Sequence, residues 1–274
     1  MIEFRSVSKQ FSDGTVAVND FSFTFPSHRA TVLVGSSGSG KTTILRMINR
    51  MVEPTTGSIL IDGIDVMTRS PVELRRSIGY VLQAGGLLPH RTVVDNVATV
   101  PMLNSVPKRQ ARHDALGLLD KVGLDRSLAS RYPHQLSGGQ QQRVGVARAL
   151  ASDPNILLMD EPFGAVDPIV RAELQAELNR LQRELAKTVV FVTHDIDEAF
   201  ALADQIVILR KGGVIAQVGS PSEILANPVD EFVASFIGAD RSHRRLHRHQ
   251  QADGSVMLVD GDGRPVGFLS EATP

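Results

Sequence analysis

Apolar residues along this chain fall into short runs separated by polar turns, and the spacing within the runs predicts alternating strands and helices. A glycine-rich turn leads into helical spacing over residues 42–52. The helix is expected to end before Pro54, because the residue before a proline disfavours the helical conformation. Around this helix, β-prone runs predict strands over residues 2–7, 16–25, 31–34, 58–61 and 78–82.

The middle of the chain changes to helical spacing. From about residue 107 to 123, apolar residues recur at three- and four-residue steps, the period of one helix face. Further elements are predicted as helices over 140–151, 169–185 and 197–203, strands over 156–159 and 188–192, and a hairpin of 206–210 and 214–218. This alternation predicts an α/β domain with a mainly parallel sheet. The helix-rich stretch of about 87–150 predicts a helical subdomain inserted into that domain.

The composition shifts after about residue 240. Residues 241–253 begin with a basic, histidine-rich run, and we predict a linker there. Two interpretations fit this run: contact with anionic lipid, or a solvated linker, which is the commoner behaviour of charge runs. The apolar runs 256–259 and 266–269 flank a glycine-rich turn and predict a β-hairpin within a tail of residues 254–274.

Composition and charge exclude several classes of protein. The 274 residues are 42% hydrophobic, which suffices for one core and a small appendage. Basic and acidic residues balance at 29 and 30, so nothing favours a nucleic-acid partner. The absence of cysteine excludes a disulfide scaffold. The first residues lack the apolar segment of a signal peptide, and the apolar runs are shorter than the roughly 20 residues of a membrane-spanning helix. Any membrane role is therefore expected to require a separate partner.

A phosphate-binding motif follows the strand predicted at 31–34. The sequence GSSGSGKT matches G-x-x-x-x-G-K-[ST], with a strand before it and a helix after it, which disfavours a flexible linker. Its glycines let backbone N–H groups approach phosphate oxygens, Lys41 adds a charge at the β- and γ-phosphates, and Thr42 can ligate Mg²⁺. The predicted ATP-binding residues here are Gly35, Ser36, Ser37, Gly38, Ser39, Gly40, Lys41, Thr42 and Thr43.

Two carboxylates end the apolar strand predicted at 156–159. The end of a buried parallel strand faces the nucleotide crevice. Asp160 is suited to the Mg²⁺ shell, and Glu161 is suited to act as general base towards the attacking water. Alone, such a pair is more often an ordinary solvated strand end. Together with the phosphate-binding motif, it predicts an NTPase.

A third motif narrows the class. Leu136-Ser137-Gly138-Gly139-Gln140 lies between the two nucleotide motifs and opens a predicted helix, whose N-terminus is a second anion site. In this respect the chain resembles the ABC ATPase family, over about residues 1–238. The resemblance implies a P-loop NTPase fold of the α/β class, an ABC nucleotide-binding domain (1–240) with an antiparallel β subdomain and the inserted helical subdomain. It also implies that Ser137–Gln140 contact ATP held by a second copy of the chain.

Other positions match the family one by one. Phe11 falls where an aromatic residue stacks on adenine, although tyrosine is more usual there; a buried core phenylalanine is the alternative. Gln83 matches the glutamine that contacts Mg²⁺ or water. Gly164-Ala165-Val166-Asp167 matches a loop that crosses the dimer interface. His194 matches the switch histidine that senses the γ-phosphate and, with Glu161 and Lys41, completes the implied catalytic set.

The sequence distinguishes among three kinds of ABC ATPase. Chromosome-organising members need long coiled coils between the nucleotide motifs, and residues 42–136 contain no sustained heptads. Translation-associated members usually carry two cassettes, and this chain has one. A transporter motor at the cytoplasmic membrane face, bound to permease subunits, fits best.

The sequences of residues 47–57 (MINRMVEPTTG) and 78–90 resemble those of the ATPases of osmoprotectant importers. Such importers carry quaternary amines such as glycine betaine, choline and carnitine, or proline. A separate binding protein would select the solute. A methionine or other amino-acid importer is the alternative. The tail resembles a remnant of a CBS domain.

Overall fold

The computed structural model describes residues 1–83, 86–164, 167–238, 247–251, 256–259 and 264–269. The chain divides into two compact units, Met1–Pro221 and Ser222–Pro274, and each is described by itself. Among the described residues, no helix is both long enough and apolar enough to cross a bilayer.

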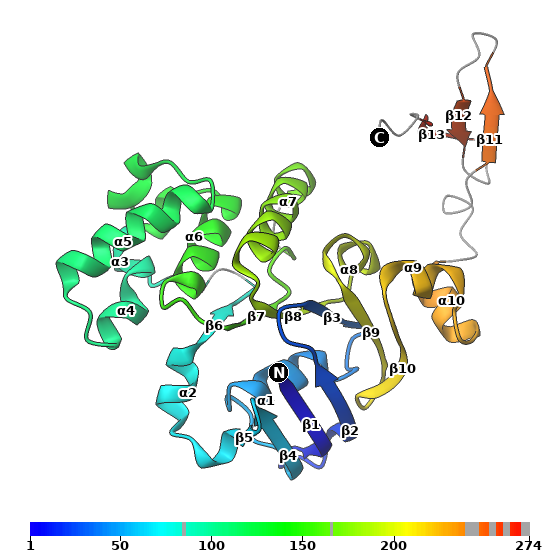
Figure 1. Cartoon of the computed structure of the whole chain (residues 1–274), viewed down its shortest axis with the longest axis horizontal. Coiled ribbons are helices and arrows are strands. Elements are labelled where there is room, and N and C mark those ends of the chain that lie inside the picture. Colours follow the sequence, from blue (N-terminus) through cyan, green and yellow to red (C-terminus); the bar gives the residue numbers. More distant parts are fainter. Residues whose placement is uncertain (84–85, 165–166, 239–246, 252–255, 260–263, 270–274) are drawn as a thin grey trace. The chain divides into compact units, whose positions relative to one another are not determined.

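Two sheets form the first unit (Figure 1). A four-stranded antiparallel sheet has the order β2-β1-β4-β5, and a six-stranded sheet has the order β10-β9-β3-β8-β7-β6. The strands of the first sheet are β1 (Ile2–Gln10), β2 (Val16–Phe25), β4 (Thr56–Ile61) and β5 (Ile64–Asp65). Those of the second are β3 (Ala30–Gly35), β6 (Ile78–Val81), β7 (Ile156–Asp160), β8 (Thr188–Thr193), β9 (Gln205–Arg210) and β10 (Val214–Gly219).

Five strands of the six-stranded sheet run parallel, and only the edge strand β10 pairs antiparallel, with β9. Every residue of β3, β7 and β8 is buried, as expected for parallel strands covered on both faces. Because the strands are parallel, the carboxyl ends of β3, β6, β7 and β8 lie at one edge of the sheet. That edge carries the predicted nucleotide motifs.

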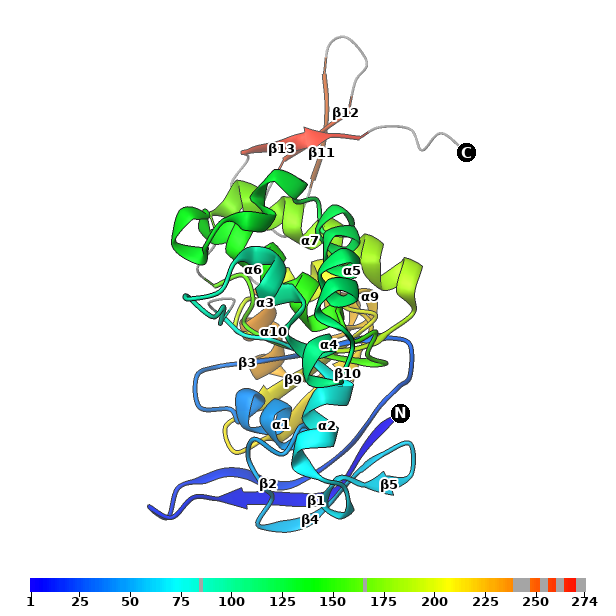
Figure 2. The same ribbon diagram turned by 90° about the vertical axis from the view of Figure 1, so that its left-hand side faces the viewer.

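Helix α1 (Lys41–Ile48) lies between the two sheets in Figures 1 and 2. It buries Ile44, Leu45, Met47 and Ile48 in a core shared by β1, β2, β4 and the parallel strands. On the antiparallel sheet, Phe4 packs edge-on against Phe21 and Phe25, with ring centroids 5.3 and 5.8 Å apart. The phosphate-binding helix is therefore held from both sides.

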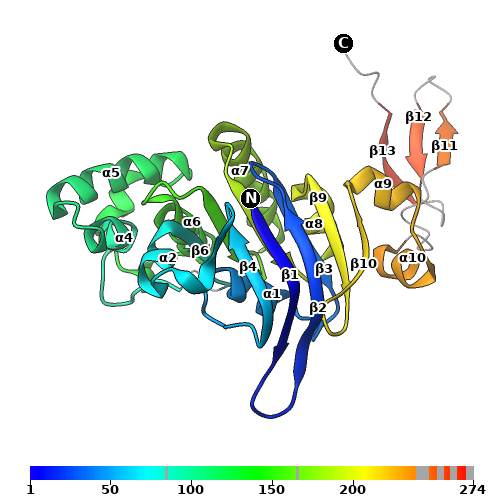
Figure 3. The same cartoon turned by 60° about the horizontal axis from the view of Figure 1, so that its bottom comes forward.

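The remaining helices of the first unit form two groups. Figure 3 shows the helices of the predicted helical subdomain gathered beyond β6, away from β9 and β10. They are α3 (Val93–Val97), α4 (Thr99–Leu103), α5 (Lys108–Lys121) and α6 (Gly138–Leu150), with short 3₁₀ turns η2 (Arg126–Ser130) and η3 (Pro133–Gln135). The others are η1 (Val66–Thr68), α2 (Pro71–Ser77), α7 (Pro168–Leu185) and α8 (Ile196–Leu202), and α9 (Pro221–Ala226) begins at the unit boundary.

The predicted strands and long helices are present, with bounds that differ by a few residues. The largest difference concerns the helix predicted over 42–52, since α1 ends at Ile48. The side chain of Asn49 accepts a hydrogen bond from the N–H of Met51 at 3.1 Å, and Arg50 has a φ of 56°. A side chain that bonds the backbone two residues on competes with helix continuation.

The second unit contains α10 (Glu231–Ile237) and a three-stranded antiparallel sheet in the order β11-β12-β13. The predicted hairpin is present as β12 (Val256–Val259) and β13 (Pro265–Phe268). The linker predicted over 241–253 is only partly a linker, because its residues His247–Gln250 form β11 and pair with β12. The strand β11 has no alternation of apolar and polar residues, because its side chains are all basic or polar, and such a segment is predicted as a loop.

Candidate functional site

The phosphate-binding loop connects the buried strand β3 to a helix whose first N–H groups have no side-chain cap. Gly40 precedes α1 with a φ of 89°, and a Cβ there would lie 2.6 Å from the carbonyl oxygen of Ala17. Glycine tolerates both the positive φ and the close approach. The first turn of α1 also lacks acidic residues. These features leave the helix N-terminus open to an anion.

Lys41 is buried beneath this loop. Its Nζ donates to the carbonyl oxygens of Gly35 at 2.7 Å and Ser36 at 3.0 Å. Burial lowers the pKa of the Lys41 ammonium, and the carboxylates of Glu161 and Asp160 partly offset that shift. Phosphate oxygens are stronger partners for an ammonium than backbone carbonyls. Lys41 is therefore placed to change partners when a phosphate enters.

Asp160, at the end of β7, has both carboxylate oxygens in hydrogen bonds. Oδ1 accepts from the Thr42 hydroxyl at 2.9 Å, and Oδ2 accepts from Tyr80 at 3.2 Å and from Arg46 at 3.3 Å. Burial and the adjacent Asp160 raise the pKa of Tyr80 to about 12, so its hydroxyl remains a donor. The Thr42 oxygen keeps lone pairs while it donates its proton. These hard oxygen donors fit Mg²⁺.

Glu161 occupies a strained position one residue after β7. Its φ is 44°, a conformation that costs a non-glycine residue about 1–3 kcal/mol and often marks a functional site. Its N–H donates to the carbonyl oxygen of Val192 at 2.9 Å, and its Oε2 lies 3.2 Å from Nδ1 of His194. The Gln83 amide donates to the same oxygen at 3.4 Å. Two predicted residues from separate segments, Gln83 and His194, thus converge on the Glu161 carboxylate.

A cavity of about 550 Å³ lies over these groups. It is lined by Ser37, Gly38, Ser39, Gly40, Lys41, Thr42, Thr43, Glu161 and His194. Two other predicted residues are hydrogen-bonded to residues of this lining: Gly35 accepts from Lys41, and Asp160 accepts from Thr42. The described lining contains the residues predicted to hold phosphate and the predicted base, and they all come from the predicted phosphate loop and the ends of β7 and β8.

Phe11 lies outside this lining, in the loop between β1 and β2. The side chain is 39% exposed, which excludes the alternative of a core phenylalanine. The Lys9 ammonium lies 5.2 Å from the centre of its ring. An exposed ring is available for stacking, so the prediction that Phe11 contacts adenine is retained as a proposal.

The Leu136–Gln140 motif begins helix α6, apart from the cavity lining. The Ser137 hydroxyl accepts from the N–H of Gln140 at 3.3 Å, and the Gln140 side chain accepts from the N–H of Ser137 at 3.0 Å. Ser137 and Gly138 are exposed, whereas Gly139 is buried. The two reciprocal bonds form a capping box. The capping box thus satisfies the N–H groups of Ser137 and Gln140, and the helix start is open to solvent.

The loop after Glu161 is partly described. Gly164 donates its N–H to the carbonyl oxygen of Glu161 at 3.2 Å, and a Cβ at Gly164 would lie 3.2 Å from the Gln83 amide. The predicted interface residues Ala165 and Val166 lie outside the described residues. The described part of this loop therefore packs against Gln83.

Arg46 and Tyr80 are site residues that the sequence analysis missed. Arg46 lies four residues after Thr42, so both side chains occupy the same face of α1. That spacing is the one sequence signal for Arg46. Tyr80 lies on a short apolar strand, and nothing in its spacing distinguishes it from a core residue.

Residues 18–164 match the ABC transporter family. The choline transport ATP-binding protein OpuBA of Bacillus subtilis (strain 168) is 53% identical over 241 residues, covering 88% of this chain and 63% of that protein. The glycine betaine uptake system ATP-binding protein YehX of Escherichia coli (strain K12) is 47% identical over 270 residues, covering 95% of this chain and 87% of that protein.

A solved structure is also similar. It is the dimeric structure of a post-hydrolysis state of the ATP-binding cassette MJ0796 bound to ADP and Pi. Its TM-score is 0.73 at 34% identity, and the match covers 81% of this chain and 99% of that chain. The chain spans less than two thirds of the length of the Bacillus subtilis relative.

Proposed function

Because the chain belongs to the ABC transporter family, we propose that it binds and hydrolyses ATP as the motor subunit of a multi-subunit importer. The observation that carries this proposal is the meeting of Lys41, Glu161 and His194 at one cavity above the Thr42–Asp160 pair. A phosphate cradle, a base and a set of metal-binding oxygens are what phosphoryl transfer to water requires.

In the proposed reaction, ATP lies with its triphosphate over the start of α1. Glu161 accepts a proton from the attacking water as the water oxygen bonds to the γ-phosphorus, and the bond to the ADP oxygen breaks. Lys41 and His194 stabilise the charge that develops on the transferring group. Bound Mg²⁺ would neutralise phosphate charge, and Thr42, Asp160 and Gln83 are the residues we expect to hold it.

We propose that a second copy completes the site. The cavity lining lacks the Ser137–Gln140 helix start among the described residues, yet that start is exposed and suited to an anion. Two copies arranged head to tail would each present it to the other's ATP. The dimeric ADP- and Pi-bound cassette to which this chain is similar supports that arrangement.

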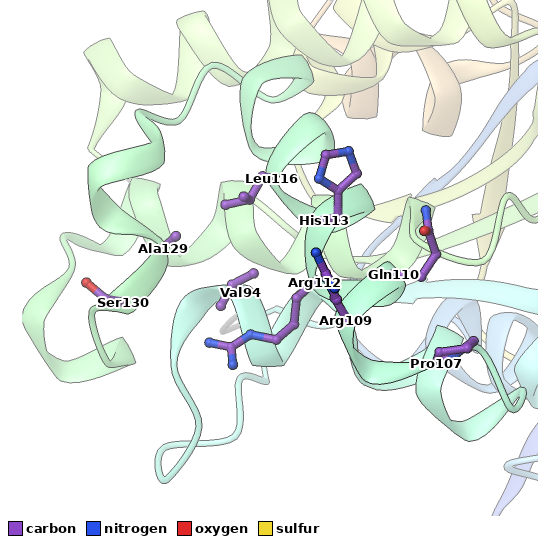
Figure 4. A pocket seen from close by; sticks show the side chains of 9 residues that line it. All are labelled: Val94, Pro107, Arg109, Gln110, Arg112, His113, Leu116, Ala129 and Ser130. Carbon is purple, nitrogen blue, oxygen red and sulfur yellow. The ribbon is translucent and has the colours of Figure 1, made fainter.

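We further propose that permease subunits hold the chain at the cytoplasmic membrane face. The helical subdomain has a groove of about 880 Å³ (Figure 4). It combines buried or half-buried apolar residues with exposed basic ones. The lining includes Val94, Leu116, Ala129, Arg109, Arg112 and His113. A permease segment with apolar and acidic side chains fits this lining.

The proposed solute is a quaternary amine such as glycine betaine, choline or carnitine, or proline. The names of the similar proteins, a choline transporter subunit and a glycine betaine uptake subunit, support this class over a methionine or other amino-acid importer. The solute would be selected by a separate binding protein and would not contact this chain.

Replacing Glu161 with glutamine tests the chemistry. An amide cannot accept the proton from water, so hydrolysis should fall by about 10²–10⁴-fold. ATP affinity, measured by fluorescent-nucleotide titration, should stay within about twofold because the P-loop contacts remain. Glu73→Gln, on exposed α2, is the matched control and should hydrolyse normally. Near-normal hydrolysis by Glu161→Gln would remove Glu161 from its role.

Uptake tests the solute class. The chain is combined with its permease and binding protein in vesicles, and uptake of labelled glycine betaine, choline and methionine is compared. Uptake of a quaternary amine supports the proposal, and uptake of methionine alone would contradict it.

A further inference from the structure

A buried carboxylate lies behind the switch histidine and takes no part in the proposed reaction. Glu198, on α8, has a side chain only 6% exposed. Its Oε2 accepts from the hydroxyl of Thr193 at 2.6 Å. Thr193 is the last residue of β8, directly before His194. The buried carboxylate therefore contacts the residue that positions the histidine.

The turn that carries His194 is fixed by a short chain of hydrogen bonds. The Thr193 oxygen also accepts from the N–H of Asp195 at 3.0 Å. The Asp195 carboxylate caps α8, accepting from the N–H groups of Asp197 at 2.8 Å and Glu198 at 3.4 Å. His194 thus lies between two residues whose backbone or side chains are held in place.

Arg171 is the cation that faces this cluster. Its Nη1 lies 3.7 Å from Oε1 of Glu198 and 3.7 Å from Oδ2 of Asp195. Arg171 stands in the first turn of α7, and its N–H donates to the carbonyl oxygen of Asp167 at 2.8 Å. The side chain is 29% exposed. It joins the start of α7 to the turn that carries His194.

The charges around Glu198 explain why its ion pair with Arg171 matters. The pKa of the Glu198 carboxyl is raised, chiefly because it is buried, and the neighbouring Asp195 adds to this shift. The Thr193 hydrogen bond, Arg171 and His194 act in the opposite direction and lower the pKa. A buried carboxylate without a cationic partner is costly. Without Arg171, the Glu198 and Asp195 carboxylates would face each other with no compensating charge from α7.

These contacts form a ring that begins and ends at Glu161. The chain runs from Glu161 into α7, where Arg171 pairs with Glu198 of α8. Glu198 accepts a hydrogen bond from Thr193, and His194 is the next residue. Nδ1 of His194 then lies 3.2 Å from Glu161. The sides of this ring that the structure describes are the Thr193–Glu198 hydrogen bond and the Arg171–Glu198 and His194–Glu161 ion pairs.

We infer that Arg171 is a positioning residue that fixes His194 relative to Glu161 through Glu198. Its ion pairs are with Glu198 and Asp195, and it is not among the residues that line the cavity, so we expect its effect to be on geometry. The inference rests on the proposed function, because it assigns Arg171 to the geometry of that same site.

The test compares variants of the full chain. Arg171→Met removes the charge and keeps much of the side-chain length. We expect kcat for ATP hydrolysis to fall by about tenfold to a hundredfold, the cost of a small misplacement of reacting groups. KM and nucleotide affinity should change by less than about twofold, because the P-loop contacts remain. Arg171→Lys, which keeps the charge, should recover much of the loss.

Arg180→Met is the matched control. Arg180 lies on the same helix and pairs with Glu177 and Glu184, two carboxylates of α7 itself. Its kcat should equal that of the unmodified chain within about twofold, because this cluster is remote from the ring. Equal losses in Arg171→Met and Arg180→Met would indicate a general effect on α7 and overturn the inference.

A double-mutant cycle separates positioning from general destabilisation. If Arg171 acts through Glu198, Arg171→Met combined with Glu198→Gln should lose little more kcat than the more damaged single variant. Multiplying losses would overturn the inference. Failure of the unmodified chain to hydrolyse ATP would instead contradict the proposed function. Normal kcat in Arg171→Met, with active unmodified chain, would contradict only the role of Arg171.

Discussion

Two helices of this protein begin at glycine-rich turns, and they differ in whether a side chain caps their first N–H groups. Helix α1 follows Gly40, has no side-chain cap and begins with Lys41, whose buried ammonium lies beneath the preceding loop. Helix α6 follows Ser137, whose hydroxyl forms a capping box with Gln140. One helix start lies without a side-chain cap in a cavity, and the other lies capped at the surface.

This difference indicates that the two helix starts bind ATP at different stages, α1 within one chain and α6 only when a second copy is present. The start of α1 already has a cation and free donors, so it can bind a triphosphate without any other chain. The capping box at the start of α6 engages the N–H groups of Ser137 and Gln140, and this helix start lies apart from the cavity lining, so we expect an anion to reach it from a second chain. One chain should therefore bind ATP, and two should be needed for rapid hydrolysis.

Of the two helix starts, α1 is where the larger effect is expected. Lys41→Ala removes the only charge placed directly beneath the phosphate loop among the described cavity-lining residues. We expect ATP hydrolysis to fall by about 10²–10³-fold, the usual loss when one preorganised electrostatic donor is removed. ATP affinity should fall as well, because the lost contact is also made to the bound substrate. Normal affinity in a titration with fluorescent nucleotide would show that Lys41 is not part of the cradle.

A slightly smaller effect is expected at the start of α6. Ser137→Asp keeps a good helix cap but places a negative charge where the second copy's phosphate would lie. Hydrolysis should fall by about 10²-fold, while ATP binding to the single chain stays unchanged. Ser137→Asn caps equally well without the charge and should retain most activity. Equal activity of the two variants, in a phosphate-release assay, would contradict an anion at Ser137.

The far end of α6 gives a stability prediction. Gly79 of β6 faces this helix so closely that a Cβ would lie 2.5 Å from the carbonyl oxygen of Ala149 and 2.5 Å from a Leu157 methyl. Gly79→Ala should lower the free energy of unfolding by about 1–3 kcal/mol through overpacking. Urea denaturation measures this change. An unchanged midpoint would mean that α6 can move away from β6 at little cost.

The smallest effect is expected at Gly117 of α5, where a Cβ would meet no atom within 4 Å. Gly117→Ala should raise the free energy of unfolding by about 0.5–1 kcal/mol, because alanine loses less conformational freedom in a helix. It is the control for Gly79→Ala in the same urea series. A decrease in stability would show that α5 is not the regular helix described.

Sequence analysis predicted the fold class and the resemblance to osmoprotectant importer subunits, and both are confirmed by the similar proteins and structure. It succeeded where spacing carries physical information. The all-apolar runs of β3, β7 and β8 require burial on both faces, and a parallel sheet supplies it. The phosphate loop could be located because its glycines, lysine and threonine have fixed spacing.

The parts of the site and fold that the sequence did not predict depend on contacts between distant segments. Arg46 and Tyr80 reach Asp160 from 114 and 80 residues away, and Arg171 meets Glu198 from another helix. Periodicity within a short segment carries no information about contacts between such distant residues. The strand β11 was missed because histidine, arginine and glutamine carry little strand signal, and only pairing with β12 reveals it.

The most direct test of the shared site is the size of the ATP-bound protein. The Glu161→Gln chain, given ATP, should sediment as a dimer, because ATP stays bound and uncleaved between two copies. Glu161→Gln combined with Ser137→Asp should bind ATP equally well and sediment as a monomer, since the start of α6 then repels the second copy's phosphate. A dimer in both variants, or a monomer in both, would contradict the account of a site shared between α1 of one chain and α6 of another.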